Sequence, residues 1–387
     1  MSTAASSDKS IHLLAFDIPI PVNYGGAIDI YYKIKALHQA GIGIHLHCFQ
    51  YGRKPAPELE NHCLSVSYYP RRFSPFHFCR QIPYIVRSRT SDNLLRQLAG
   101  QKLPILFEGL HSCFYLDHPS LKHHLKIVRT HNIEHDYYFN LARVEKNRWK
   151  RLYFNREARK LKRFEKILFH ANGIAAISLK DTQHFAATYK DMPIDTISAF
   201  HPFNQVEYHP EKGSYALYHG SLEVGENNQA ALFLINEVFS KTDIPLIIAG
   251  NKPSQELVNC VNEHDHVELR TGLSTEAIYK LVRDAQVNIL PTFQATGIKL
   301  KLLISLYIGR HCIVNFPMVE STGLESMCHI KDTAAEMRAC LKELMATPYT
   351  REEAAHRQEI FEQGGYCNSV NVEKLIRMLF PRPVDYR

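Results

Sequence analysis

Short apolar runs alternate with longer mixed segments throughout the first half of the chain. The runs cover residues 11–16, 43–49, 64–69, 105–107, 127–129, 174–177 and 194–198. Each has the length of a buried strand, and the segments between them are long enough for helices. Strands that alternate with helices predict a parallel sheet covered by helices on both faces.

The same pattern starts again in the second half. Apolar runs cover residues 215–219, 246–249, 266–269, 287–290 and 312–315, and helices are predicted at 229–239, 254–263, 275–285 and 298–307. His201-Pro202 and His209-Pro210 interrupt any regular element between the halves. We therefore expect two Rossmann-like doubly wound domains, with a disordered N-terminus at 1–10, domains at 11–205 and 206–365, and a final helical segment at 366–387.

Composition is consistent with two α/β domains. The 387 residues are 45% hydrophobic, which is enough for a core in each domain. No apolar run approaches the roughly 20 residues of a membrane span, and the N-terminus lacks the apolar segment of a signal peptide. The nine cysteines include no Cys-x-x-Cys pair, and several lie within predicted strands. These features predict a soluble, cytoplasmic protein whose cysteines are reduced and buried.

Positive charge is concentrated in the first half. The net charge of +7 results from 46 Lys and Arg against 39 Asp and Glu, and residues 143–166 are rich in Arg and Lys interspersed with Tyr, Phe and Trp. A basic aromatic segment of this kind could meet an anionic membrane surface, phosphorylated substrates or nucleic acid. A solvated helix face is the commoner explanation of such a segment.

The region from Val287 to Asn315 has the pattern of a phosphate-binding unit: strand, polar loop, helix, strand. Thr296 can cap the helix, Gly297 allows an anion to approach the backbone, and the first N–H groups of the helix are free to donate. Many strand-turn-helix units share this pattern without binding phosphate. Lys299 and Lys301 favour the phosphate interpretation, because the helix is apolar on nearly every face and one lysine needs an anionic partner or a path to solvent.

Polar or glycine-containing turns follow most of the other predicted strands. They contain Gly25 and Gly26, Glu108 and His111, His131 and Asn132, Gly220 and Ser221, and Thr271, Gly272 and Leu273. Open parallel sheets bind ligands beyond the carboxyl ends of their strands, and two such sheets facing each other would form a cleft there. We therefore place the candidate site at these turns.

These motifs together resemble the GT-B glycosyltransferases, specifically the retaining, family 4-like group that builds bacterial surface polysaccharides. The resemblance covers nearly the whole chain and rests on Gly25-Gly26-Ala27, Arg129-Thr130-His131-Asn132-Ile133-Glu134, Tyr218-His219-Gly220-Ser221-Leu222 and Gly297-Ile298-Lys299-Leu300-Lys301. It implies two Rossmann-like domains facing across a cleft. Residues 11–205 would hold the acceptor, 206–365 the nucleotide-sugar, and the helix at 366–387 would cross back to the first domain.

The resemblance also implies roles for single residues. The donor diphosphate would lie at Thr296, Gly297, Lys299 and Lys301, with room left by Gly220 and Ser221, and the nucleotide base would lie near Thr271, Gly272 and Leu273. Gly25, Gly26 and Asn132 would border the acceptor. His131 would be the catalytic polar residue, with Glu108 and His111 as second choices. Without a metal, lysines and backbone N–H groups must neutralise the departing diphosphate.

The chain departs from the family at one place. Many relatives carry two glutamates seven residues apart in the donor site, and the matching positions here are Thr296 and Ile304. The departure keeps open a non-catalytic, GT-B-like subunit of a polysaccharide assembly complex. A nucleotide-sugar epimerase of the same fold is the other alternative.

Other chemistries have little support in the sequence. His131 and His135 are four residues apart and His45 and His47 alternate, but neither pair has a third ligand at a typical spacing. There is no Asp-x-Asp motif after a strand, no Gly-x-Ser-x-Gly elbow and no phosphate-binding Gly-x-x-x-x-Gly-Lys loop. We therefore predict no metal site and no cofactor.

The resulting prediction is a metal-independent hexosyltransferase. It would move a sugar from a nucleoside diphosphate donor to a saccharide acceptor attached to a lipid carrier, with peripheral contact at the inner face of the membrane and no nucleic-acid partner. The sugar, the nucleotide, the linkage and the oligomeric state are left open by the sequence.

Overall fold

The computed structural model describes residues 9–74, 81–145, 147–293 and 300–382. The chain divides into two compact units: unit 1 comprises residues 1–143, 147–201 and 365–387, and unit 2 comprises 144–146 and 202–364. Of the N-terminal segment expected to be disordered, residues 1–8 lie outside the described residues. Ser10 already belongs to the first strand, so that expectation was wrong at its last residue.

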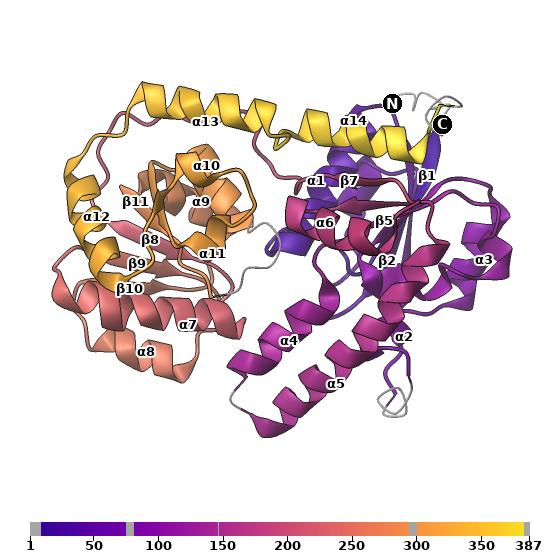
Figure 1. Cartoon of the computed structure of the whole chain (residues 1–387), viewed down its shortest axis with the longest axis horizontal. Helices are drawn as coiled ribbons and strands as arrows, with labels where there is room; N and C mark the ends of the chain where they lie inside the picture. The colour runs from indigo at the N-terminus through magenta and orange to yellow at the C-terminus, as the bar shows by residue number, and fades with distance from the viewer. Residues whose placement is uncertain (1–8, 75–80, 146, 294–299, 383–387) are drawn as a thin grey trace. The chain divides into compact units, whose positions relative to one another are not determined.

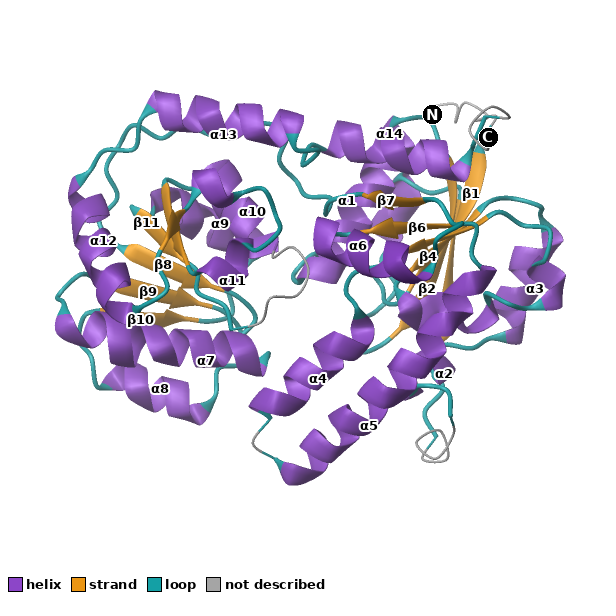
Figure 2. Ribbon diagram, viewed as in Figure 1, coloured by secondary structure: helices purple, strands orange, loops and turns teal. Residues whose placement is uncertain are grey.

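Unit 1 contains a seven-stranded parallel sheet with the order β3-β2-β1-β4-β5-β6-β7. Several of its strands are labelled in Figures 1 and 2. Its strands are β1 (Ser10–Ala15), β2 (Gly43–Gln50), β3 (Ser65–Pro70), β4 (Ile105–Glu108), β5 (Lys126–Arg129), β6 (Gly173–Ala176) and β7 (Ile194–Thr196). Its helices are α1 (Gly25–Gln39), α2 (Tyr84–Arg87), α3 (Asp92–Gly100), α4 (Glu134–Val144), α5 (Arg148–Phe164), α6 (Leu179–Thr188) and α14 (Asn368–Leu379).

Apolar side chains at successive positions of β1 pack into two hydrophobic cores, one on each face of the sheet. Leu13 packs with residues of α1 and α14 such as Ile34 and Leu375. Leu14 packs on the other face, in the cluster that holds Leu98 of α3. Burial on both faces explains why the strands are continuous apolar runs rather than alternating ones.

Unit 2 contains a six-stranded parallel sheet with the order β10-β9-β8-β11-β12-β13. Its strands are β8 (Ala216–His219), β9 (Leu246–Ala249), β10 (Val267–Arg270), β11 (Val287–Ile289), β12 (His311–Val314) and β13 (His329–Ile330). Its helices are α7 (Gly225–Phe233), α8 (Gln255–Asn262), α9 (Thr275–Asp284), α10 (Leu300–Ile308), α11 (Phe316–Val319), α12 (Ala334–Ala346) and α13 (Arg351–Gln363). In both sheets the order reverses beside the first strand of the unit, as in doubly wound folds.

Three of the differences from the sequence-based expectation concern the course of the backbone. The helix expected at 229–239 begins at Gly225 and continues after Phe233 as a π-helix, Leu234–Val238. Strand β7 ends at Thr196 rather than at residue 198, and the Ser198 N–H donates to the Asn371 side chain instead. Strand β13 was not expected, because two residues carry no periodic pattern.

Side chains fix several helix starts. Thr333 and Thr350 form capping boxes with Glu336 and Glu353 at the starts of α12 and α13. Of the helices that the structure describes, none is long and apolar enough to cross a membrane. The eight described cysteines are free thiols.

Candidate active site

A buried group of charged side chains lies at the reversal point of the unit 1 sheet. Glu108 is the last residue of β4, Arg129 is the last residue of β5, and His131 follows two residues later. Asp29 and Lys33 lie one turn apart on α1, the helix that follows β1. Residues at the carboxyl ends of strands and on the crossover helix therefore meet where doubly wound folds bind ligands.

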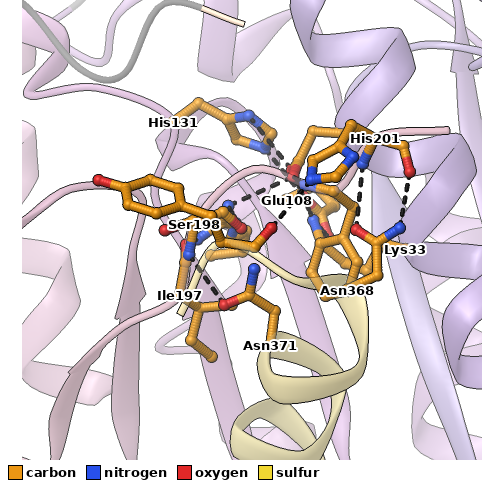
Figure 3. A network of polar contacts seen from close by, with 12 residues as sticks. Lys33, Glu108, His131, Ile197, Ser198, His201, Asn368 and Asn371 are labelled. Atoms are coloured by element: carbon orange, nitrogen blue, oxygen red, sulfur yellow. Dashed lines mark hydrogen bonds and ion pairs between the residues drawn. The ribbon is translucent and has the colours of Figure 1, made fainter. Parts of the chain in front are cut away.

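The ion pairs of this group converge on Lys33, which Figure 3 labels together with Glu108 and His131. Its Nζ lies 2.8 Å from Asp29 Oδ2 and 2.8 Å from both carboxylate oxygens of Glu108. The side chains of Lys33 and Glu108 are 0% exposed and that of Asp29 is 1% exposed. A buried lysine with two carboxylates is stable only when each charge is paired and hydrogen-bonded, as here.

Arg129 completes the charge balance. Its Nη2 lies 3.3 Å from Asp29 Oδ1 and 3.2 Å from the carbonyl oxygen of Ser198, and its Nη1 donates to the carbonyl oxygen of Ile197. The Phe200 N–H also donates to Asp29 Oδ1, at 2.8 Å. Two buried cations therefore face two buried carboxylates, and the group is tied to the segment after β7.

The two carboxylates are ionised at neutral pH. Burial alone would raise the pKa of Glu108, but Lys33 and the hydrogen bond from His131 outweigh it and lower that pKa below its ordinary value. Burial acts in the same direction on Asp29, and Lys33, Arg129 and His131 hold the pKa of its carboxyl far below the usual range.

His131 is the member of the group that reaches the surface, with its side chain 10% exposed. Its Nε2 lies 2.8 Å from Glu108 Oε2, and its Nδ1 lies 3.8 Å from Asp29 Oδ2, beyond hydrogen-bonding distance. In a neutral imidazole whose Nε2–H donates to the carboxylate, the lone pair is on Nδ1. The edge of Phe16 packs against the ring, at 5.3 Å between centroids. Glu108 thus fixes the orientation of the imidazole.

His111 and Glu134 form a second, uncharged pair in unit 1. His111 Nδ1 lies 3.7 Å from Glu134 Oε1, which is too long for a hydrogen bond, and neither atom has a partner among the described residues. Burial lowers the pKa of His111 well below its ordinary value and raises the pKa of Glu134 to about 8. Both are therefore neutral near pH 7.

Three glycines place the chain around these residues. Gly109 has φ +69, and a Cβ there would lie 2.9 Å from His111 Nδ1. Gly25 and Gly26 form the start of α1, where a Cβ on Gly26 would lie 2.9 Å from the Phe16 ring. Asn132 follows His131 and is half-buried. Glu108, His111 and His131 thus gather at one edge of the sheet, while Gly26 is required by packing against Phe16.

Lys301 lies near the reversal point of the unit 2 sheet, as the second residue of α10. Its Nζ lies 2.9 Å from Asn227 Oδ1 and 3.2 Å from the Tyr218 hydroxyl, and 4.8 Å from the centre of the Tyr218 ring. Tyr218 belongs to β8 and Asn227 to the first turn of α7. The ammonium is therefore held beyond the central strand by neutral oxygens and an aromatic face.

The turn after β8 is tightly packed. The Gly220 N–H donates to the Ala249 carbonyl at 3.0 Å, and a Cβ on Gly250 would lie 2.0 Å from Gly220 O. The Ser221 carbonyl accepts from Asn227 Nδ2 at 3.0 Å. Next to it, burial and then the Lys301 charge lower the pKa of His219 to about 3, and its Nε2 lies 3.1 Å from Ser305 Oγ.

The remaining predicted donor residues divide into two groups. Thr271, Gly272 and Leu273 follow β10, where Gly272 has φ +69 and its N–H donates to Asn251 Oδ1 at 2.7 Å. Thr296, Gly297 and Lys299 lie outside the described residues, so their roles stay predictions.

Sequence reasoning missed several members of these groups. Asp29 and Lys33 were not singled out, although two charges four residues apart in a helix flanked by isoleucines are a signal of a buried ion pair. Glu226 was also missed: it is buried, and its Oε1 accepts from Thr292 Oγ1 and, at 3.3 Å, from the Phe293 N–H. No local pattern connects Glu226 with a loop 66 residues away.

Solved structures resemble the chain over nearly its whole length. Sucrose-phosphate synthase from Thermosynechococcus elongatus has 14% sequence identity and a TM-score of 0.68, covering 96% of this chain and 99% of that chain. A mutant of TarM from S. aureus in complex with Fondaparinux, alpha-GlcNAc-glycerol and UDP has 11% identity and a TM-score of 0.66, covering 96% and 100%. Trehalose-6-phosphate synthase OtsA has 10% identity and a TM-score of 0.62, covering 97% and 99%. The fold is GT-B, that of glycosyltransferases.

One curated protein is similar in sequence. An uncharacterized 44.6 kDa protein in the cps region of Klebsiella pneumoniae is 26% identical over 321 residues, covering 76% of this chain and 79% of that protein. No protein-family model matches the chain.

Proposed function

We propose that this chain is a glycosyltransferase that moves a hexosyl group from a nucleoside diphosphate sugar to a saccharide acceptor. The observation that carries the proposal is the position of Lys301 in a GT-B fold, with its ammonium beside Tyr218 and Asn227 at the reversal point of the unit 2 sheet. Doubly wound sheets bind nucleotides at such points. A fixed cation there suits a departing diphosphate, whose negative charge grows during transfer.

In unit 1, His131 is the residue proposed to act on the sugar substrates. Its Nδ1 accepts a hydroxyl proton or hydrogen bond, because Nε2–H is held by Glu108. Glu108 is a positioning residue in this account, since its side chain is 0% exposed and both of its oxygens are within 2.8 Å of Lys33. His111, neutral and next to Glu134, is proposed to line the same strand-end surface.

The relative in the cps region supports a place in surface-polysaccharide synthesis. The TarM structure contains UDP, so uridine diphosphate sugars are the first donors to test. We propose a retaining, metal-independent reaction; an NMR time course that shows inverted product would exclude retention.

A membrane contact through α5 would bring the enzyme to a lipid-linked acceptor. Trp149 is 81% exposed and Leu152 58% exposed near the start of this helix. The exposed cations on and just after α5 are Arg148, Lys150, Arg151, Arg156, Arg159, Lys162, Arg163 and Lys166. Cations with exposed aromatic and aliphatic side chains suit an anionic lipid surface. Flotation with anionic vesicles at low and high salt tests this contact. Binding that is unchanged by salt and by the substitution Trp149→Ser would exclude it.

The experiment that tests the function measures thermal stability with a panel of nucleoside diphosphates and their sugars. The wild type is compared with Lys301→Ala and with the matched control Lys280→Ala, whose side chain is 75% exposed on α9. A ligand that binds only the folded state raises the midpoint by mass action. We expect a selective rise with one nucleotide, kept in Lys280→Ala and lost in Lys301→Ala; no shift with any nucleotide would contradict the proposal.

Product analysis then separates the alternatives. An epimerase would convert the nucleotide-sugar without any saccharide acceptor. A non-catalytic subunit, suggested by the buried Ile304 at a position where many relatives carry glutamate, would bind partners without turnover.

A further inference from the structure

A cluster of two histidines and a glutamate lies in unit 2, at the amino-terminal end of β12. His311 is the first residue of β12, His329 is the first residue of β13, and Glu353 lies in the first turn of α13. One ligand atom from each lies within 4.8 Å of the other two. We propose that these three residues bind a divalent transition-metal ion, with zinc as the first choice.

The hydrogen bonding of the His311 imidazole suits a metal ligand. Its Nε2–H donates to the Thr347 carbonyl at 3.1 Å, which leaves the lone pair on Nδ1. The residue is 1% exposed, and Nδ1 has no hydrogen-bond partner among the described residues. Metal-binding histidines have this arrangement, in which a backbone carbonyl fixes the tautomer and the other nitrogen faces the ion. A buried nitrogen without a donor is otherwise costly.

Glu353 is oriented in a similar way. Its Oε2 accepts the Thr350 N–H at 2.8 Å as part of the capping box of α13, and its Oε1 lies 3.7 Å from His311 Nδ1. Two acceptors facing each other repel unless a proton or a cation lies between them, and 3.7 Å is too long for a direct hydrogen bond. Ligands on a tetrahedral zinc ion are about 3.3 Å apart, so a small movement closes the site.

His329 supplies the third ligand. Its partner across the strands is Ile313, two residues after His311, so both imidazoles lie on one face of the sheet. Their ring centres are 5.8 Å apart. Two imidazoles and a carboxylate are a common set for zinc and for related first-row metals, and Glu353, with its side chain 40% exposed, leaves a path for the ion and for a water ligand.

One cationic side chain of α13, Arg357, is also buried in unit 2. Arg357 itself donates to the carbonyls of Gly309 at 2.9 Å and Arg310 at 2.6 Å, so it does not fill the position between the ligands. A bound ion would join β12, β13 and α13 at the first residue of β12, and would stabilise unit 2 rather than take part in transfer.

The test is zinc binding to the full-length protein without an affinity tag, stripped with a chelator and titrated by calorimetry. The variants are His329→Ala and Glu353→Gln; glutamine at this position preserves the capping box, so α13 keeps its start. His184→Ala is the matched control, because it removes a histidine from another cluster, His135, Glu165 and His184.

We expect one high-affinity site in the wild type and in His184→Ala. Both test variants should weaken binding by more than about 100-fold, which exceeds the roughly 10- to 100-fold effect of a supporting hydrogen bond. Cobalt should give the intense visible absorption of a tetrahedral site in the wild type and not in His329→Ala. Weak binding that survives both variants, or loss of the site in His184→Ala alone, would overturn the proposal.

Discussion

The two units each contain a cluster of imidazole and carboxylate side chains. The clusters differ in whether a cation of the protein pairs with the carboxylates. In unit 1, Asp29 and Glu108 surround the Lys33 ammonium at 2.8 Å, and His131 binds the outer edge of Glu108. In unit 2, His311 and Glu353 face each other at 3.7 Å without a cation between them among the described residues. The first cluster carries its own cation, whereas the second has a position for one.

The comparison teaches that the spacing of ligand atoms alone does not define a metal site. Asp29, Glu108 and His131 lie as close together as His311, His329 and Glu353. A cluster whose carboxylates are already paired with protons or cations of the protein is a positioning network, whereas a cluster without such partners can bind a metal ion. Substitutions that remove these protons and cations therefore test the distinction.

The largest effect is expected when the unit 1 cluster loses its cation. Lys33→Met leaves Asp29 and Glu108 buried with one cation fewer, and breaking a buried pair in this way costs about 3–5 kcal/mol. The free energy of unfolding from urea titration measures the loss. The exposed control Lys280→Met should change stability by less than about 0.5 kcal/mol. Equal effects of the two variants would mean that Lys33 does not balance the carboxylates.

A smaller effect is expected at Glu134, whose buried carboxyl group is protonated. Its pKa is raised to about 8, so between about pH 4.5 and pH 8 the folded protein holds a proton that the unfolded chain releases. Wild-type stability should therefore fall as pH rises through this window. Glu134→Gln should remove that decline, which amounts to roughly 3.5 kcal/mol between pH 5 and pH 8 at about 1.36 kcal/mol per pKa unit. Parallel stability curves for the two proteins would contradict the assignment.

The smallest effect is expected at Glu165, whose carboxylate is hydrogen-bonded to two imidazoles. His135 Nδ1 and His184 Nε2 each lie 3.2 Å from a Glu165 oxygen. Burial opposes ionisation, but these hydrogen bonds lower the pKa of Glu165 to about 2, and its carboxylate in turn raises the pKa of His184.

This contribution has a defined pH window. It is lost as pH falls from about 4.5 towards 2 and as pH rises through the folded pKa of His184, so it is largest between about pH 4.5 and 6.5. His184→Ala should cost about 1 kcal/mol in that window, measured by urea titration. A constant difference at every pH would show a packing effect instead.

Much of the fold could be predicted because its signals are local. Most strands of the two sheets are apolar runs, and their alternation with helices predicts parallel, doubly wound sheets. The meeting of Glu108 and His131 was also predictable, since Glu108 ends one strand and His131 follows the neighbouring strand of a parallel sheet.

The clusters themselves could not be predicted, because their members are far apart in sequence. Lys33 and Glu108 are separated by 75 positions, and the pattern of α1 does not indicate which carboxylate the lysine meets. His311, His329 and Glu353 come from two strands and a helix with no regular spacing. Only the register of β12 with β13 brings the two histidines to one face.

The most direct test of the proposed function is transfer of a labelled sugar by the wild type and by His131→Ala, with donor binding measured separately for each. We predict that the wild type transfers the sugar to a saccharide acceptor, and that His131→Ala binds the donor normally but is slower by about 10²- to 10⁴-fold. A wild type that binds no nucleotide-sugar and transfers none, or a His131→Ala variant with undiminished turnover, would contradict the account.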